Sequence, residues 1–385
     1  MELLSVIDVR TIFILLPFTA LLMALVLWLG PRSERREGLG RWIVGLSLIS
    51  AGWLLMAARG AIAPVLSVAL ADSLIMAGLL LQVSALYEFR YLKTLNLSFC
   101  LVPASVLFAV LFLIPMEFRQ YSLLASFVIS MPLLVMGVQS WSLGESAVRW
   151  PMAFFYIAGG ILLQARALHI WFSEETDLHF FSSHPLHIIA FIESFAMTIS
   201  GSFGFLEMQR WRAEKNIRYF AMYDELTDLL NRRSFFKLAE RERVRARRRG
   251  KPIALLMLDL DHFKAINDRH GHFIGDRVLK QFAVVVKENL RADDLLCRSG
   301  GEEFMALLTD VRGEKAVNIA QRVRAAVQEM SVKGLDADVT VSIGVAMCDD
   351  LEEGAIERGL KIADNALYEA KNNGRNQVVL SESAV

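Results

Sequence analysis

Carboxylates stand beside two features of this chain that could hold a phosphate-bearing ligand. A Gly-Gly pair at positions 300–301 is followed at once by Glu302 and Glu303. Glycines permit a tight turn and let the phosphates of a ligand approach bare backbone. Earlier in the chain, the apolar run 253–258 predicts a buried strand, and it ends at Asp259. Carboxylates in such positions suit a hard divalent cation, because Mg²⁺ takes one or two protein carboxylates plus substrate phosphates.

Further motifs surround these carboxylates in a definite order. They are Asp224–Arg232 (DELTDLLNR), Asp259–Asp268 (DLDHFKAIND), Gly271-His272, Gly275-Asp276, Gly300–Phe304 (GGEEF), Ser342–Ala346 (SIGVA) and Ala366–Asn376 (ALYEAKNNGRN). A single acidic motif is most often a solvated turn or strand end, whereas this ordered set is specific. Over about residues 216–383, the chain resembles the GGDEF family of diguanylate cyclases.

The resemblance implies a reaction that joins two GTP molecules into cyclic di-GMP and releases two pyrophosphates. It implies Mg²⁺ or Mn²⁺ as cofactor, held by Asp259, Glu302 and the carbonyl of Leu260. Glu302, Glu303 and Lys264 match the catalytic residues, with Lys264 stabilising charge on the transferring phosphate. On a straight strand Glu303 would face away from Glu302, so its part in metal binding or proton transfer stays open. 

Residues that would bind substrate and product follow from the same resemblance. The substrate-binding set is Phe263, Lys264, Asn267, His272, Asp276, Lys371 and Arg375. An amide and a carboxylate can pair with the donor edge of guanine, and arginine suits bidentate contact with phosphate. Arg291 and Asp294 match an RxxD product site, and Arg322 matches a further arginine of that site. The resemblance therefore implies inhibition by the product. Asp261 could also approach the metal, but it ranks below Asp259.

Charge is divided very unevenly along the chain. Residues 1–206 hold 11 Lys or Arg and 12 Asp or Glu, whereas residues 207–385 hold 30 and 29 of the 41 of each kind. A membrane-spanning helix needs roughly 20 apolar residues. Stretches of about that length lie near 11–30, 41–58, 65–87, 97–115, 121–141, 151–172 and 185–206. The sequence predicts a membrane α-helical bundle of about seven spans, or six if one stretch lies flat or is re-entrant.

Loop charge predicts the orientation of these spans. Basic residues concentrate in the loops that follow the first, third, fifth and seventh stretches: Arg32, Arg35, Arg36, Arg41, Arg90, Lys93, Arg149, Arg210, Arg212, Lys215 and Arg218. The positive-inside rule then places the amino terminus outside and the carboxy-terminal domain in the cytoplasm. We expect a multi-pass protein of the bacterial inner membrane, with membrane lipid as a partner. The three cysteines form no CxxC pair or disulfide framework, in keeping with a reducing compartment.

Three parts are expected along the chain. Residues 1–206 form a transmembrane sensor domain, 207–223 a helical linker, and 224–383 a GGDEF domain. As in the family, this domain should be α/β, with a mostly antiparallel central sheet flanked by helices. Apolar residues Ala213, Ile217 and Phe220 of the linker sit at coiled-coil spacing. They favour either a short stalk of a homodimer or a lone amphipathic helix.

Three charged residues lie within the predicted spans, namely Asp72, Arg166 and Glu193. Intramembrane charges usually pair or line a polar cavity. We expect Arg166 to pair with Asp72 or Glu193, in one polar cavity near the outer face. The pair is either a structural ion pair or part of a sensing site. Four histidines lie around an acidic outer loop and suit either a metal or pH sensor or an interfacial aromatic belt: His169, His179, His184 and His187.

Three classes of function fit these patterns. The first is a membrane-bound cyclase regulated by its membrane half and by product. The second is a non-catalytic receptor for GTP or cyclic di-GMP, and the third is a transporter with a nucleotide-sensing tail. Intact carboxylates at the turn, together with Lys264, favour the enzyme. The basic run 241–251 could suggest nucleic acid, but a solvated helix end explains it, and we expect no nucleic-acid partner.

Overall fold

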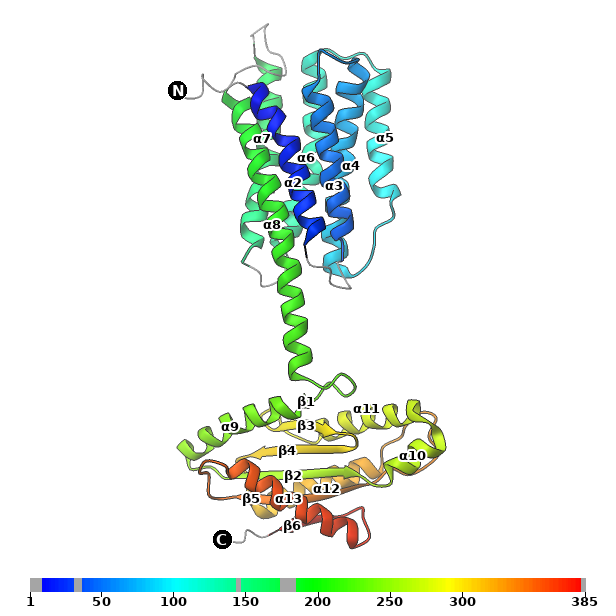
Figure 1. The fold of residues 1–385 in the computed structure, drawn as a ribbon, viewed down its shortest axis with the longest axis vertical. Helices are drawn as coiled ribbons and strands as arrows, with labels where there is room; N and C mark the ends of the chain where they lie inside the picture. The colour runs from blue at the N-terminus through cyan, green and yellow to red at the C-terminus, as the bar shows by residue number, and fades with distance from the viewer. Residues whose placement is uncertain (1–8, 31–36, 143–146, 174–184, 382–385) are drawn as a thin grey trace. The chain divides into compact units, whose positions relative to one another are not determined.

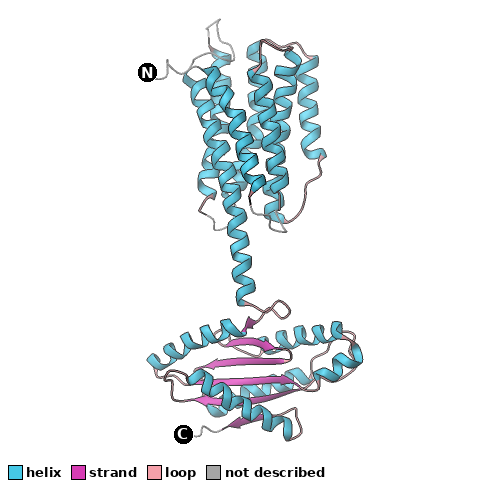
Figure 2. Ribbon diagram, in the orientation of Figure 1, coloured by secondary structure: helices cyan, strands magenta, loops and turns pink. Residues whose placement is uncertain are grey.

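The computed structural model of the protein describes residues 9–30, 37–142, 147–173 and 185–381. The chain divides into two compact units, Met1–Ala213 and Glu214–Val385 (Figure 1). The first unit is helical, and the second combines helices with one sheet (Figure 2). The sequence therefore predicted the two classes of structure correctly, an α-helical part followed by an α/β part.

The first unit is built from long apolar helices. These are α2 (Val9–Leu29), α3 (Leu39–Ala57), the π-helical turn η1 (Val65–Leu70) with α4 (Ala71–Tyr91), α5 (Ser98–Leu113), α6 (Phe118–Trp141), α7 (Arg149–Phe172) and α8 (Pro185–Met222). Among the described residues, five helices are long and apolar enough to cross a membrane: α3, η1 with α4, α6, α7 and α8.

The predicted count of seven spans is not confirmed, because α2 and α5 have shorter apolar stretches. The 16 residues of α5 rise only about 24 Å at the α-helical step, below the roughly 30 Å of a hydrocarbon core. The periodicity of the sequence located these helices, but it did not reveal that α5 ends so early. Three of the basic loop residues, Arg32, Arg35 and Arg36, and two of the histidines, His179 and His184, lie outside the described residues.

Small residues and aromatic rings hold the first unit together. A Cβ placed on Gly45 would lie 2.7 Å from the carbonyl oxygen of Gly78, so α3 and α4 touch backbone to backbone. Glycines at helix crossings allow such close approach in membrane proteins. Trp42 stacks on Phe205 of α8, with ring centroids 4.4 Å apart. Large apolar side chains remain exposed on the outward faces, as at Val102 of α5, which is consistent with a surface that lipid covers.

The second unit holds one six-stranded sheet. Its strands are β1 (Leu230–Asn231), β2 (Ile253–Leu260), β3 (Leu295–Gly300), β4 (Glu303–Thr309), β5 (Val341–Cys348) and β6 (Val378–Ser381). Its helices are α9 (Arg232–Arg249), α10 (Phe263–His270), α11 (His272–Glu288), α12 (Gly313–Gln328) and α13 (Ala355–Asn372). The strands lie in the order β1-β3-β4-β2-β5-β6, so the two strands that carry the acidic motifs, β2 and β4, are central neighbours.

The sheet is mixed, which corrects the expectation of a mostly antiparallel sheet. The four central strands pair antiparallel, as predicted. The two outer pairs, β1 with β3 and β5 with β6, are parallel. Parallel neighbours require a long crossover connection, and α13 supplies it between β5 and β6.

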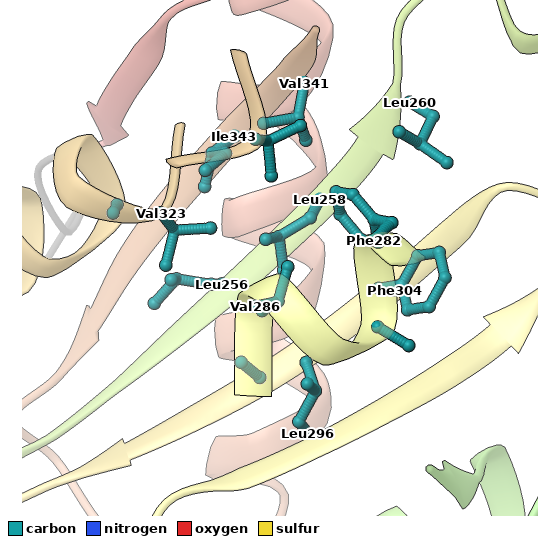
Figure 3. Close-up of a cluster of buried hydrophobic side chains, with 14 of the residues drawn as sticks. Leu256, Leu258, Leu260, Phe282, Val286, Leu296, Phe304, Val323, Val341 and Ile343 are labelled. Atoms are coloured by element: carbon teal, nitrogen blue, oxygen red, sulfur yellow. The ribbon is translucent and has the colours of Figure 1, made fainter. Parts of the chain in front are cut away.

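Alternation along β2 assigns its residues to the two faces of the sheet. Leu256 and Leu258 pack against Phe282 of α11 and Val323 of α12 (Figure 3). Residues of the other parity, such as Leu255, pack on the opposite face, which α9 and α13 cover. Side chains two apart share a face, so Asp259 at the end of β2 points to the same side as α13.

A very close helix–sheet contact of this unit lies at Gly344 of β5. A Cβ there would be 2.0 Å from the carbonyl oxygen of Ala363 and 2.3 Å from the amide nitrogen of Leu367, both on α13. We expect Gly344→Ala to lower the free energy of unfolding of this unit by about 1–3 kcal/mol through overpacking. Pulse proteolysis of the full chain in urea would measure the change.

The matched control is Gly313→Ala at the start of α12. There the nearest atoms to an added Cβ are 3.9 Å away, so the substitution should be neutral or slightly stabilising. Equal urea midpoints for the two variants would contradict the close packing of α13 on β5.

Candidate active site

Asp259 stands at the centre of the candidate site because of the register of the central strands. It lies directly opposite Glu303 of β4 and Ser342 of β5. The side chain of Asp259 is buried, and its Oδ2 lies 2.8 Å from Nζ of Lys371. Burial raises the pKa of Asp259, and the hydrogen bond and charge of Lys371 offset part of that rise. The carboxylate is thus held in the protein interior with one cationic partner.

The turn between β3 and β4 brings a second carboxylate to the same place. Gly300 and Gly301 both have positive φ, 153° and 54°, which makes this sharp reversal possible. The carbonyl oxygen of Glu302 accepts a hydrogen bond from the amide of Leu260, at 3.4 Å. Burial raises the pKa of Glu302, and the negative charge of Asp259 raises it further. The two carboxylates therefore lie within electrostatic reach of each other, as the metal-site prediction requires.

These residues fit a hard divalent cation. Asp259 and Glu302 supply carboxylate oxygens, and Leu260 supplies a neighbouring backbone carbonyl. Within the described ranges, no group of three or more His, Cys, Asp or Glu side chains forms a metal cluster. A set of two carboxylates and a carbonyl is nevertheless typical of Mg²⁺ sites, whose other ligands are waters and phosphate oxygens. Glu303 is exposed, and its role as a ligand or proton carrier stays a prediction.

Asp261 has a different part from Asp259. Its Oδ1 accepts a hydrogen bond from Ser342 Oγ at 2.7 Å, and its Oδ2 accepts from Thr340 Oγ1 at 2.8 Å and from the amide of Asn376 at 3.0 Å. The carboxylate therefore ties the end of β2 to β5 and to the turn after α13. That turn contains Arg375, whose charge also acts on Asp259. Asp261 is thus a positioning residue, and the lower rank that it had as a metal ligand agrees with its contacts.

The amino-terminal turn of α10 offers two backbone donors. His262 takes a left-handed conformation with φ of 55°, and no side chain caps the helix. The amides of Phe263 and Lys264 have no acceptor in the part of the chain that the structure describes. Free amides at a helix start, aided by the helix dipole, suit an anionic group. The side chain of Lys264 is exposed beside them.

A close contact between α10 and α11 shapes the next part of the site. A Cβ on Gly275 would lie only 1.8 Å from Oδ1 of Asn267, so only glycine leaves room for that amide. This Oδ1 is buried and has no hydrogen-bond partner among the described residues. His272 and Asp276 are exposed and lie one turn apart on α11, so they share a face. Three of the seven predicted substrate residues, Asn267, His272 and Asp276, thus lie near the α10–α11 junction.

The predicted product site forms a turn before β3. Asp294 accepts hydrogen bonds from the amide of Arg291 at 2.9 Å and from the amide of Thr309 at 3.0 Å. Arg322 of α12 reaches the same turn, donating from Nη2 to the carbonyl oxygen of Asn289 at 2.6 Å. The structure brings Arg322 next to the segment that precedes the RxxD run, and its role in binding product stays a prediction. Both arginine side chains are exposed, whereas Asp294 is engaged in holding the turn.

Arg298, directly before the signature turn, is a site residue that the sequence reasoning missed. Its Nε and Nη2 donate to the carbonyl oxygen of Gly301 at 2.9 and 2.8 Å. Its Nη1 donates to Asp224 at 3.1 Å, where the domain begins. Burial raises the pKa of Asp224, but hydrogen bonds from Thr227 and Arg298 outweigh it and lower that pKa. Asp224 opens a quoted motif and Arg298 lies two residues before another, and only the fold reveals that they meet.

Sequence similarity to known proteins is found for this unit. Residues 221–377 match the sequence model described as "Diguanylate cyclase, GGDEF domain". The chain is 39% identical over 177 residues to the probable diguanylate cyclase DgcT of Escherichia coli (strain K12), covering 44% of this chain and 37% of that protein. It is 40% identical over 168 residues to the diguanylate cyclase DgcM of the same strain, covering 44% and 40%. The chain therefore spans less than half the length of these curated relatives.

A solved structure is similar over the same region. It is the coiled coil and GGDEF domain of DgcB from Caulobacter crescentus, in complex with c-di-GMP. The sequences are 31% identical, the match covers 46% of this chain and 94% of that one, and the TM-score is 0.43.

The raised pKa of Glu302 leads to a prediction about stability without metal or nucleotide. A carboxylate whose pKa is higher in the folded state destabilises the fold when it is ionised, above both pKa values. This loss of folding stability disappears as the pH falls through the folded-state pKa, because the carboxylate then becomes protonated. We therefore expect Glu302→Gln to raise the urea midpoint of this unit at pH 7 in EDTA, with a difference that narrows toward pH 4.

Pulse proteolysis at a series of pH values would measure both trends. The control is Glu303→Gln, which removes an exposed carboxylate and should shift the midpoint much less. A lower urea midpoint for Glu302→Gln than for the wild type at pH 7 would contradict this prediction. It would mean that the ionised carboxylate of Glu302 stabilises the fold.

Proposed function

Because residues 221–377 form a GGDEF domain, we propose that the whole chain is a membrane-bound diguanylate cyclase. It would convert two GTP molecules into cyclic di-GMP and two pyrophosphates. The observation that carries this proposal is the meeting of two carboxylates, Asp259 and Glu302, close to Lys371 and to the uncapped start of α10. Such a site combines a place for a cation with donors for phosphates, which is the combination that nucleotidyl transfer needs.

In the proposed reaction, the 3′-oxygen of each GTP forms a bond to the α-phosphorus of the other. The bond between that phosphorus and the bridging oxygen of pyrophosphate breaks, and the 3′-hydroxyl proton is lost. Asp259, Glu302 and the Leu260 carbonyl would hold Mg²⁺ or Mn²⁺, which makes the hydroxyl more acidic and offsets phosphate charge when bound. The exposed carboxylate of Glu303 is available to take up the proton.

The chain's own donors would hold the triphosphate. The amides of Phe263 and Lys264 point from the start of α10, and the ammonium of Lys264 can follow the charge that develops on the transferring phosphate. Lys371 and Arg375 add positive charge from the end of α13. Lys371 would exchange part of its interaction with Asp259 for the phosphates when a cation arrives.

Guanine would be recognised at the α10–α11 junction. Oδ1 of Asn267 is buried and has no protein donor among the described residues, so a donor group of the base can satisfy it. The carboxylate of Asp276 can accept a second hydrogen bond from the same donor edge, and His272 lies one turn away. Adenine would leave these acceptors unpaired, which penalises the wrong base strongly.

A homodimer is part of this proposal because the reaction needs two nucleotides face to face. The exposed apolar residues Ala213, Ile217 and Phe220 of α8 support it, since they repeat at coiled-coil spacing and have solvent-exposed side chains. With the apolar helices of the first unit, we place the protein in the bacterial inner membrane with the GGDEF domain in the cytoplasm. Seven spans with an external amino terminus remain our proposal for the topology.

Feedback by product is proposed at the turn that holds Arg291 and Asp294. Exposed guanidinium groups of Arg291 and Arg322 suit the phosphates and guanine faces of cyclic di-GMP. The turn is held by backbone hydrogen bonds to Asp294, so it can present these arginines without involving the carboxylates of the active site.

Removal of the negative charge of either Asp259 or Glu302 should nearly abolish turnover. We expect Asp259→Asn or Glu302→Gln to lower cyclic di-GMP formation by about 100-fold or more, since each removes charge from the cation site. The assay uses the full chain in detergent with GTP and Mg²⁺, following cyclic di-GMP and pyrophosphate. The matched control is Asp364→Asn, an exposed carboxylate of α13, which should leave the rate unchanged.

Two results would contradict the assignment. Substantial synthesis by either variant would reject these residues as the cation site. Wild-type protein that binds GTP and forms no cyclic di-GMP would favour the receptor function over the enzyme.

Feedback can be tested separately from chemistry. We expect Arg291→Ala to raise the cyclic di-GMP concentration for half-inhibition by about tenfold or more, because a lost charge-assisted contact removes roughly 1.5–3 kcal/mol. The initial rate should stay close to that of the wild type. Arg241→Ala, at an exposed position of α9, is the control and should keep wild-type inhibition. Unchanged inhibition in Arg291→Ala would place the product site elsewhere.

A further inference from the structure

The first unit contains a cavity of about 110 Å³ that the proposed cyclase reaction does not use. Its wall is formed by α3, α4, α6, α7 and α8. All three charged residues singled out within the predicted spans, Asp72, Arg166 and Glu193, line it, as does Tyr121. Asp72 and Tyr121 lie near the starts of their helices, Arg166 lies toward the end of α7, and Glu193 lies near the start of α8. In consecutive helices these positions fall at one end of the bundle.

Two of the three charges already have interactions within the wall. Asp72 is 2% exposed and accepts a hydrogen bond from the hydroxyl of Tyr121 at 2.5 Å. Arg166 is also buried and interacts electrostatically with Asp72. Arg59 lies over the ring of Tyr121, with 5.3 Å to the centroid, and its charge also acts on Asp72. The negative charge of Asp72 is therefore offset by the hydroxyl of Tyr121 and by the charges of Arg59 and Arg166, whereas the pairing of Arg166 with Asp72 or Glu193 stays a prediction.

Glu193, the third charged residue, has no comparable hydrogen bond or nearby positive charge among the described residues. Its Oε1 is buried and has no hydrogen-bond partner among the described residues. The carboxylate rests over Gly159 of α7, where a Cβ would lie 2.7 Å from Oε2 and 2.9 Å from Oε1. Glu193 as a whole is half-buried, but a carboxylate oxygen that is buried without a partner is costly, and more so in a membrane. Glycine at 159 leaves room for the carboxylate to stay at the cavity wall.

The rest of the lining indicates what could satisfy Glu193. Aromatic side chains of Trp53, Tyr156 and Phe191 stand in the wall, together with many aliphatic ones. Aromatic rings and a carboxylate together favour an ammonium group, and the aliphatic wall favours an apolar body. A cavity of about 150 Å³ holds benzene, so about 110 Å³ suits a ligand of roughly four or five non-hydrogen atoms.

We propose that this cavity is a binding site for a small organic amine, whose ammonium group pairs with Glu193 and whose apolar body lies among the aromatic and aliphatic side chains. The class of ligand follows from the volume and from Glu193, whose Oε1 has no partner among the described residues. An anion would be repelled by this carboxylate, and a neutral molecule could donate a hydrogen bond to it but would leave its negative charge unbalanced.

The helix that carries Glu193 could also connect ligand binding in the cavity to cyclase activity. Ser194, Met197 and Thr198 of α8 line the cavity beside Glu193, and α8 continues without interruption to Met222. If the proposed cyclase function holds, a ligand in the cavity changes the packing of α8 and thereby the rate of cyclic di-GMP synthesis. Binding itself does not depend on that function.

The test uses the full chain in detergent and three probes of equal length and different charge: n-butylamine, 1-butanol and butyrate at pH 7. We expect n-butylamine to raise the Tm of the first unit by a few degrees, because it binds the folded state. The dependence of this shift on amine concentration should indicate a saturable site. Intrinsic tryptophan fluorescence reports this unit, because all seven tryptophans precede residue 213. The two other probes should give no saturable shift.

Two variants locate the site. Glu193→Gln removes the charge, and Gly159→Ala keeps it but fills the space beneath the carboxylate; both should abolish the shift by n-butylamine. The matched control is Glu207→Gln, an exposed carboxylate on the same helix, which should retain the shift. Because the two variants act differently, a folding failure in one leaves the other as the test.

Several outcomes would overturn the proposal. Equal shifts by n-butylamine and 1-butanol, a saturable shift by butyrate, or a shift that survives in Glu193→Gln would each do so. Failure to respond to n-butylamine by wild-type protein with normal cyclase activity would reject the amine site while leaving the proposed function intact. Loss of cyclase activity with a normal amine response would do the reverse.

Discussion

The candidate active site depends on keeping two carboxylates close together at the edge of a protein core. Register alone places Asp259 opposite Glu303 at the end of the central strands, and the glycine turn then adds Glu302. Burial disfavours the charge on both Asp259 and Glu302; the negative charge of Asp259 adds to this at Glu302, and that of Asp261 adds to it at Asp259. Such an arrangement is unfavourable without a cation and becomes favourable with one, because the cation offsets both charges at once. The strands around it must therefore be rigid enough to hold the unfavourable state.

That rigidity comes from polar contacts that look incidental in the sequence. Asp261 uses both of its oxygens to join the end of β2 to β5 and to the turn that carries Arg375. Arg298 fixes the carbonyl of Gly301 and reaches Asp224, so the signature turn is anchored to the first residues of the domain. Neither residue needs to touch a substrate. Both determine where the groups that do so are placed, because the glycine turn has little stiffness of its own.

Much of this unit could be predicted from sequence because its signals are local. Apolar alternation along 253–260 predicted a buried strand ending at Asp259, and the ordered motifs predicted the family. Contacts between residues far apart in the chain could not be read in this way. The pairing of Arg298 with Asp224 and the parallel outer strands depend on the order in which strands enter the sheet. In the first unit, hydropathy located the helices, but the length of α5 that is actually helical decides whether it can span.

Both units contain carboxylates that are partly or fully removed from water, one set beside the sheet and the other among the apolar helices. In the sheet domain, Lys371 partly balances Asp259 and remains close enough to turn toward phosphates. In the helical unit, Tyr121 and Arg166 balance Asp72, whereas Oε1 of Glu193 is left without a protein donor among the described residues. A charge that the fold leaves unbalanced is stable only when something else neutralises it. For Asp259 and Glu302 the partner that we propose is a divalent cation, and for Glu193 the size and lining of the cavity favour an organic one. Since α8 carries Glu193 and continues to Met222, neutralising that single carboxylate changes the forces on the helix that links the first unit to the second.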